Sequence, residues 1–171
     1  MAGRILRSLV ALGLVIFGAA EAEQVCRDDI LATAPDSRFQ DNGNGTVTDL
    51  ATGLIWKQCA EGLSGAGCAS GRAATFTWQE ALQHAEAADF AGSSMWRLPN
   101  KNELASLVER RCYAPAINER YFPSTPSSWF WSSSPYADYS RGAWYVYFLY
   151  GNVYGNFKPF DGYVRLVRAG Q

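Results

Sequence analysis

The chain has 171 residues, a formal net charge of −1, 48% hydrophobic residues and 18% charged residues. This length suits one folded domain, and the hydrophobic content excludes a disordered tail or a solvating linker. Aromatic residues make up 14% of the chain, while charged residues fall below the roughly 25% usual for soluble domains. We therefore expect a surface rich in tyrosine, tryptophan, serine and asparagine, which favours an extracellular module.

The first 22 residues are predicted to be a signal peptide. Two arginines form a positive start, residues 9–18 form an apolar run, and Ala20-Glu21-Ala22 is typical of a cleavage site. An uncleaved membrane anchor is the less favoured alternative, because the run has only about half of the ~20 residues that a spanning helix needs. We expect a secreted or periplasmic protein with no transmembrane span after cleavage.

Four cysteines remain after cleavage, and an even number in an exported domain favours two disulfides. Sequence alone allows three pairings of these cysteines. The loop between Cys59 and Cys68 contains three glycines and has little rigidity of its own, so we expect a local bridge there. Cys26 is then left to pair with Cys112. Zinc is the rival interpretation, but the chain lacks a Cys-x2-Cys pair and has one histidine, so no metal or cofactor is expected.

Residues 23–38 are expected to form an irregular lead-in to a domain over residues 39–171. Residues 39–49 predict a β-hairpin, because Asn-Gly steps favour its turn and a Thr-Val-Thr run favours extended backbone. A calcium loop is the alternative interpretation. It is disfavoured because Gly43 and Gly45 occupy positions that need oxygen-bearing side chains.

Two helices follow in the predicted order. Thr77 and Glu80 form a capping box, and apolar residues at helical spacing extend this helix to about residue 89. A second helix is expected after Pro99, with Asn100 as its cap. Its predicted buried stripe consists of Leu104, Leu107 and Val108.

Residues 121–163 contain 16 aromatic residues in 43 positions. Turns are expected at residues 150–152 and again at residues 154–156. Because no βαβ alternation is visible, we predict an α+β fold with two helices packed on small antiparallel sheets. The strands in this prediction are the hairpin at residues 39–49 and four further strands at residues 54–58, 130–134, 143–148 and 163–168.

Seven motifs give the chain a resemblance to the Lcl C-terminal domain family, a bacterial domain of unknown function. The resemblance runs from about residue 39 to residue 170, with the motifs in the same order. The motifs are Gly43-Asn44-Gly45-Thr46-Val47-Thr48-Asp49, Thr52-Gly53-Leu54-Ile55-Trp56, Thr77-Trp78-Gln79-Glu80-Ala81, Trp96-Arg97-Leu98-Pro99-Asn100, Glu103-Leu104, Phe130-Trp131-Ser132-Ser133-Ser134 and Val164-Arg165-Leu166-Val167-Arg168.

This resemblance implies a C-type-lectin-like fold, distantly similar to the formylglycine-generating sulfatase-activating domain. That enzyme domain binds copper through two late cysteines, whereas this chain has none after Cys112. The tripeptides with which C-type lectins bind sugar through calcium are also absent from the chain. The resemblance therefore implies neither activity.

The sequence offers little support for catalysis. His84 is the only histidine, and we expect it to lie on a helix flank without an orienting partner. Trp56, Trp78 and Trp96 are expected to be core anchors, and Arg97 to hold the connector between the helices. No enzyme activity is predicted.

Charge is distributed unevenly along the chain. Residues 23–96 carry 4 basic and 10 acidic residues, whereas residues 97–171 carry 9 basic and 5 acidic residues. A basic half rich in aromatic residues favours binding of an acidic polysaccharide or another envelope component, and predicted export disfavours nucleic acid. The alternative function is that of a structural or protein-interaction domain of the envelope, which would assemble with itself as a homo-oligomer or with a neighbouring protein. The predicted ligand-binding residues, placed in loops between strands, are Tyr136, Tyr139, Arg141, Tyr150, Asn152, Tyr154, Asn156 and Lys158.

Overall fold

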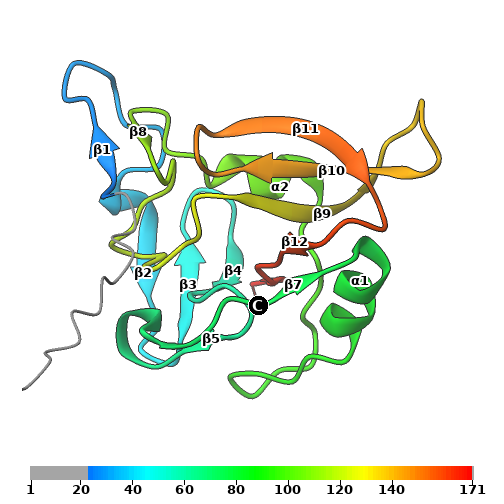
Figure 1. Cartoon of the computed structure of the whole chain (residues 1–171). Helices are drawn as coiled ribbons and strands as arrows, with labels where there is room; N and C mark the ends of the chain where they lie inside the picture. The colour runs from blue at the N-terminus through cyan, green and yellow to red at the C-terminus, as the bar shows by residue number, and fades with distance from the viewer. Residues whose placement is uncertain (1–22, 171) are drawn as a thin grey trace, which may run out of the picture.

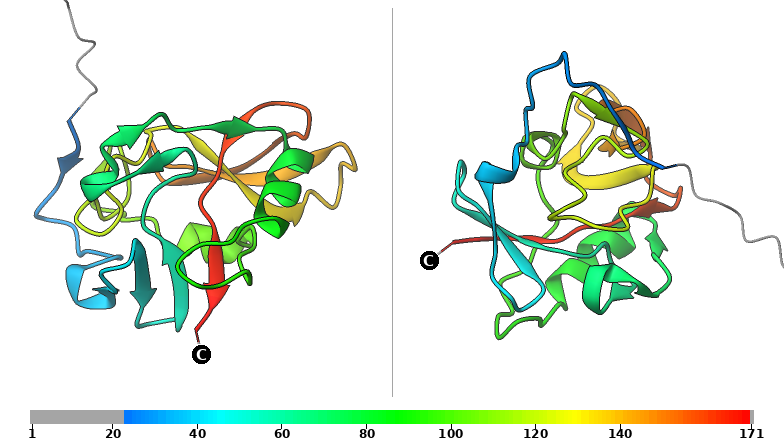
Figure 2. Two further views of the ribbon diagram at one scale, coloured as in Figure 1. Left: turned by 90° about the horizontal axis from the view of Figure 1, so that it is seen from below. Right: turned by 90° about the vertical axis from the view of Figure 1, so that its left-hand side faces the viewer.

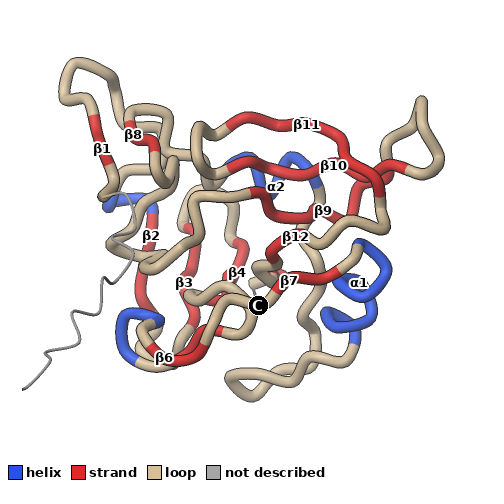
Figure 3. The backbone as a smooth tube through the Cα atoms, in the orientation of Figure 1, coloured by secondary structure: helices blue, strands red, loops and turns tan. Residues whose placement is uncertain are grey.

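The computed structural model describes residues 23–170 and shows an α+β domain (Figure 1). The predicted signal peptide, residues 1–22, lies outside the described residues. In the described part, no helix has both the length and the apolarity needed to cross a membrane. Short strands carry most of the regular structure, and long loops connect them (Figure 3).

Two sheets form the body of the domain. The larger sheet has the strand order β11-β10-β9-β12-β7, and all its pairs are antiparallel except the β12–β9 pair. The second sheet is antiparallel throughout, with the order β13-β4-β3-β2. The larger sheet consists of β7 (Thr75–Phe76), β9 (Trp129–Pro135), β10 (Gly142–Tyr147), β11 (Asn152–Phe157) and β12 (Gly162–Tyr163). The second consists of β2 (Phe39–Asp41), β3 (Thr46–Asp49), β4 (Leu54–Lys57) and β13 (Val167–Ala169).

Both predicted disulfides are confirmed, and each lies beside a small structural element. Cys26–Cys112 joins β1 (Val25–Cys26) to β8 (Cys112–Tyr113), where the two cysteines are directly opposite each other. Cys59–Cys68 closes the glycine-rich loop. The remaining short elements are the strand pair β5 (Leu63–Ser64) and β6 (Ser70–Gly71) and the 3-10 turns η1 (Asp36–Arg38) and η2 (Ala66–Cys68).

Both helices begin as predicted, because local side chains satisfy their first backbone N–H groups. α1 (Trp78–Glu86) has a capping box between Thr77 and Glu80, and α2 (Lys101–Ser106) has one between Asn100 and Glu103. The second helix is shorter than predicted, because it was expected to include the whole buried stripe. α2 ends at Ser106, and Leu107 and Val108 are buried just beyond its end.

Two predictions about the C-terminal third are wrong. Residues 163–168 do not form one strand, because the buried segment 164–166 carries the chain from β12 into β13 of the other sheet (Figure 2). Residues 154–156 form part of β11 rather than a turn. Gly151 adopts a φ of 73° and makes the single turn between β10 and β11, whereas Gly155 pairs with Trp144 in the ladder.

The two helices pack against opposite faces of the larger sheet. Phe130 and Leu104 belong to one core cluster, which α2 covers, whereas Trp131 and Ala81 belong to a second cluster, which α1 covers. This arrangement follows from strand alternation, because neighbouring residues of β9 point to opposite faces. Trp56 and Trp96 are buried as predicted, and Trp78 is half-buried with its indole N–H donating to the Ser132 carbonyl.

Two arginines, Arg97 and Arg165, form hydrogen bonds that connect separate segments of the chain near these clusters. Arg97 donates two hydrogen bonds to the Glu103 carboxylate at 2.8 and 2.7 Å, which confirms its predicted role in the connector. Arg165 is fully buried and donates to the Lys57 and Gln58 carbonyls and to Thr125 Oγ1. Burial lowers the pKa of Arg165 to about 9, against the opposing influence of Glu61, so the guanidinium stays charged at neutral pH.

Candidate functional site

Alternation along β9, β10 and β11 divides the aromatic residues of the larger sheet between its two faces. Phe130 and Val146 are opposite each other in the ladder and are buried, together with Phe148, toward α2. Tyr145 and Tyr147 therefore point to the other face. This division is the one that the alternating pattern of residues 143–148 predicts.

The opposite face carries a patch of partly exposed rings, which we call the aromatic face: Trp129, Tyr145, Tyr147 and Tyr154. Tyr145 lies opposite Tyr154 in the ladder, and their ring centroids are 6.1 Å apart. The Trp129 ring lies 5.3 Å from that of Tyr145. Tyr154 is 48% exposed, and the other three rings are half-buried. The patch is thus a fixed, accessible aromatic platform.

The Tyr145 phenol of this face is protonated at neutral pH. Burial raises the pKa of Tyr145, and the neighbouring phenols of Tyr154 and Tyr147 raise it further. A protonated phenol both donates and accepts hydrogen bonds. The aromatic face therefore combines apolar ring area with neutral polar groups.

Gly162 in β12 leaves the space that the tryptophan rings occupy. A Cβ atom there would lie 2.7 Å from Trp129 Cζ3 and 3.0 Å from Trp131 Cδ1. The two indoles pack edge to face, with ring centroids 5.0 Å apart. Because a side chain at position 162 would push one ring away, Gly162 sets the position of Trp129 on the aromatic face.

A cavity of about 240 Å³ lies at the end of the β10–β11 hairpin. The loop after β9 folds back so that Tyr136 packs on Trp144, with ring centroids 4.5 Å apart. Glycines at positions 142 and 155 keep space free, because a Cβ at either would contact Tyr136 at 3.3 Å. The lining residues are Tyr136, Tyr139, Gly142, Gly155, Asn156 and Phe157.

The predicted ligand residues divide between the two ends of this hairpin. Tyr136, Tyr139 and Asn156 line the cavity, whereas Tyr150 and Asn152 lie at the opposite end, because Asn152 pairs with Tyr147 and Phe157 with Gly142. Six residues of strand separate the ends by roughly 17 Å. Placing all eight residues in loops is wrong: Asn152, Tyr154 and Asn156 belong to β11.

The two basic residues predicted to contact a ligand, Arg141 and Lys158, differ in whether the fold already uses their charged groups. Arg141 is exposed, with its guanidinium 5.7 Å from the centre of the Tyr139 ring. Lys158 instead donates to the Ser140 carbonyl at 2.8 Å and lies 4.4 Å from the centre of the Trp78 ring. Lys158 therefore fastens the loop, and Arg141 is the cation available beside the cavity.

His84 was expected to lack an orienting partner, but in the structure Glu61 lies beside it. Its Nε2 lies 2.8 Å from Glu61 Oε2, and Lys57 Nζ lies 2.7 Å from Glu61 Oε1. Among the described residues, no hydroxyl or thiol hydrogen-bonds to His84, so the pair has no nucleophile beside it. Residues 23–170 also contain no cluster of three or more histidine, cysteine, aspartate or glutamate side chains that could hold a metal ion.

Comparison with known proteins adds a family to this geometry. A family model of the Lcl C-terminal domain matches residues 45–168, well over half of the chain. The chain belongs to this family. A search of curated proteins finds no match. The aromatic face and the cavity lie inside the Lcl C-terminal domain, whereas Cys26 precedes it, so the Cys26–Cys112 bridge ties the N-terminal segment to the domain.

Sequence reasoning missed several residues of the site. Lys101 at the start of α2 places its Nζ 4.4 Å from the centre of the Trp144 ring, close to where Tyr136 packs. Gly142 and Gly155 shape the cavity by lacking side chains. The recurrence of glycine between aromatic residues in this segment of the Lcl C-terminal domain is the signal that could have indicated a packed aromatic site.

Proposed function

We propose that this Lcl C-terminal domain is an exported, non-catalytic module that binds acidic glycans or related polyanions at the cell envelope. The observation that carries the proposal is the aromatic face, where Tyr154 and its three neighbours expose rings on a rigid sheet. Such rings pack on the apolar faces of sugars, while phenol and amide groups hydrogen-bond to hydroxyls. Two structural disulfides suit an oxidising compartment.

The cavity and Arg141 supply the contacts that an acidic sugar would need. Arg141 is exposed beside Tyr139, and a guanidinium pairs with a carboxylate or sulfate through two parallel hydrogen bonds. A single exposed charge pair is weak and screened by salt. Affinity would therefore come from several sugars bound along the hairpin, with ring stacking as the main contribution.

We further propose a C-type-lectin-like arrangement for the fold. Two helices on opposite sides of a largely antiparallel sheet, with a disulfide that fastens the N-terminal segment to the middle of the chain, support this assignment. The assignment implies no calcium site here.

Retention on heparin and alginate columns tests the proposed function. The parent protein should be retained at low salt and elute as salt rises. Tyr154→Ala and Arg141→Ala should each elute earlier, at unchanged melting temperature. Arg72→Ala is the matched control for Arg141→Ala, because it also removes an exposed positive charge, but from the segment after β6. Absence of retention on either column, or equal elution of all variants, would contradict the proposal.

A self-assembling envelope domain is the second candidate, because β11 is an edge strand of the larger sheet. An edge strand presents unpaired backbone groups that can pair with a second copy. The exposed Tyr154 and Phe157 on this strand would become buried in such a pair. Light scattering after size exclusion decides this point: a stable oligomer without glycan retention would favour assembly over glycan binding.

A further inference from the structure

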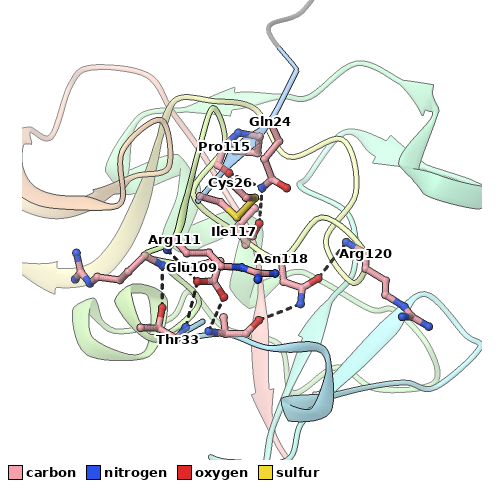
Figure 4. Close-up of a disulfide and its surroundings, with 12 residues drawn as sticks. Gln24, Cys26, Thr33, Glu109, Arg111, Pro115, Ile117, Asn118 and Arg120 are labelled. Atoms are coloured by element: carbon pink, nitrogen blue, oxygen red, sulfur yellow. Dashed lines mark hydrogen bonds between the residues drawn. A yellow bond between two sulfur atoms is a disulfide. The ribbon is translucent and has the colours of Figure 1, made fainter. Parts of the chain in front are cut away.

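A second cavity lies away from the aromatic face, between the N-terminal segment and the segment after α2. Its volume is about 340 Å³, within the size range of small-molecule sites. The Cys26–Cys112 disulfide forms part of its wall, and Figure 4 shows the polar side chains that gather around it. Its polar lining residues include Gln24, Asp36, Glu109, Arg111, Asn118 and Arg120.

Most of these polar groups already have partners within the chain. Glu109 accepts hydrogen bonds from the backbone N–H groups of Thr33, Ala34 and Arg111. The Gln24 amide donates to the Pro115 and Ile117 carbonyls at 2.6 and 2.7 Å. These bonds fix the walls of the cavity without using a ligand (Figure 4).

The Asp36 and Asn118 side chains also line this cavity. Asn118 Nδ2 donates to Asp36 Oδ1 at 2.9 Å, and Arg120 Nη1 donates to Asp36 Oδ2 at 2.8 Å. The Asn118 hydrogen bond lowers the pKa of Asp36, and Arg120 and then Arg111 lower it further against the effect of burial. Asp36 is therefore a carboxylate at neutral pH, and each of its oxygens keeps a free lone pair.

Arg111 is the exception among these groups. Its Nε is buried with no hydrogen-bond partner, and among residues 23–170 Arg111 acts on Asp36 through charge alone, without a hydrogen bond between them. Arg165 and Arg168 also have a buried Nε without a partner, but their Nη1 atoms donate to carbonyl oxygens. A buried polar group without a partner is costly, so a half-buried arginine at a cavity wall with an unpartnered Nε is suited to bind an anion.

We propose that this cavity binds an α-amino acid carboxylate, either as a free amino acid or as the C-terminus of a peptide. The Arg111 fork binds the carboxylate through two hydrogen bonds, and Asp36 accepts from the adjacent N–H group of the ligand. The three acidic residues that line the cavity, Asp36, Glu109 and Glu119, disfavour a dianion such as phosphate. This site is independent of the glycan surface.

Nitrogen-15 NMR of the arginine side chains tests this proposal directly. Alanine represents the free amino acid, triglycine represents a peptide end, and alaninamide is the matched probe without a carboxylate. Alanine or triglycine should shift the Arg111 Nε–H resonance in a saturable manner. Tighter binding of alanine would identify the ligand as a free amino acid, and tighter binding of triglycine would identify it as a peptide C-terminus. Alaninamide should leave the resonance unchanged. No shift with either carboxylate, or tighter binding of inorganic phosphate, would overturn the proposal.

Two substitutions separate a binding role from general electrostatics. Arg111→Gln should weaken carboxylate binding at least about tenfold, because it removes both charge-assisted hydrogen bonds. Arg110→Gln is the matched control, since it removes the same charge from an exposed neighbour outside the cavity, and it should bind within about twofold of the parent. Equal binding by both variants would overturn the proposal.

Two further readouts keep the test decisive. If Arg111→Gln does not fold, the Nε resonance of the unmodified protein still decides the matter. Retention of Arg111→Gln on the acidic-glycan columns should match the parent, so failure of this site and failure of the glycan surface are distinguishable.

Discussion

The two disulfides should contribute unequally to stability, because they close loops of very different length. Cys26 and Cys112 are 86 residues apart, whereas Cys59 and Cys68 are 9 residues apart. On the chain-entropy account, the long bridge stabilises the folded protein by about 4.5 kcal/mol and the short one by about 2.5 kcal/mol. Removing the long bridge should therefore cost about 2 kcal/mol more than removing the short one.

Urea unfolding of three proteins measures this difference: the parent, the Cys26→Ala/Cys112→Ala variant and the Cys59→Ala/Cys68→Ala variant. Each double variant replaces two cysteines, of which one is buried: Cys112 in the first variant and Cys68 in the second. The loss of packing is therefore similar in the two variants. The slope of the free energy of unfolding against urea concentration should rise in both variants as the unfolded chain expands. An equal or larger loss of stability in the short-loop variant would refute the reasoning.

Two further predictions concern packing and acid stability. Gly162→Ala places a Cβ 2.7 Å from Trp129, which should cost about 1–3 kcal/mol and lower the melting temperature by about 2–12 °C in a circular dichroism melt. Gly155→Ala, whose closest contact would be 3.3 Å, is the control, and equal melting of both variants would contradict this reasoning. Burial alone would raise the pKa of Asp49, but hydrogen bonds from Arg38 and Thr52 outweigh it and the pKa is lowered. The resulting stability is present above the unfolded pKa of about 3.9 and is lost as pH falls through the folded value. Asp49→Asn should therefore flatten the fall of the unfolding free energy below about pH 4, and an unchanged profile would show that Asp49 is not responsible.

Features set by neighbouring residues could be predicted from the sequence. Both capping boxes join residues three apart, and the Cys59–Cys68 bridge closes a loop of nine. The division of β10 between two faces follows from a period of two along a single strand. In each case, the residues that determine the structure lie within one turn, loop or strand.

Apart from the Cys26–Cys112 bridge, which followed by elimination once Cys59 was paired with Cys68, features that depend on distant partners could not be predicted. The end of the chain divides between two sheets because β13 pairs with β4, more than 100 residues earlier. Lys158 looks like an exposed cation in the sequence, yet the folded loop brings the Ser140 carbonyl to it. His84 likewise meets Glu61 only after α1 packs against the segment that follows β4. Charge and residue type thus led to a candidate region of the sequence, but they could not show which side chains there the fold already pairs.

Mapping of backbone amide shifts with an alginate oligosaccharide tests the central claim most directly. The account predicts saturable shifts concentrated in β10 and β11, at Tyr145 and Tyr154 and in the loop at residues 136–141, with the second sheet unaffected. Shifts concentrated in β2, β3 and β4, or no shifts at millimolar sugar and low salt, would contradict it.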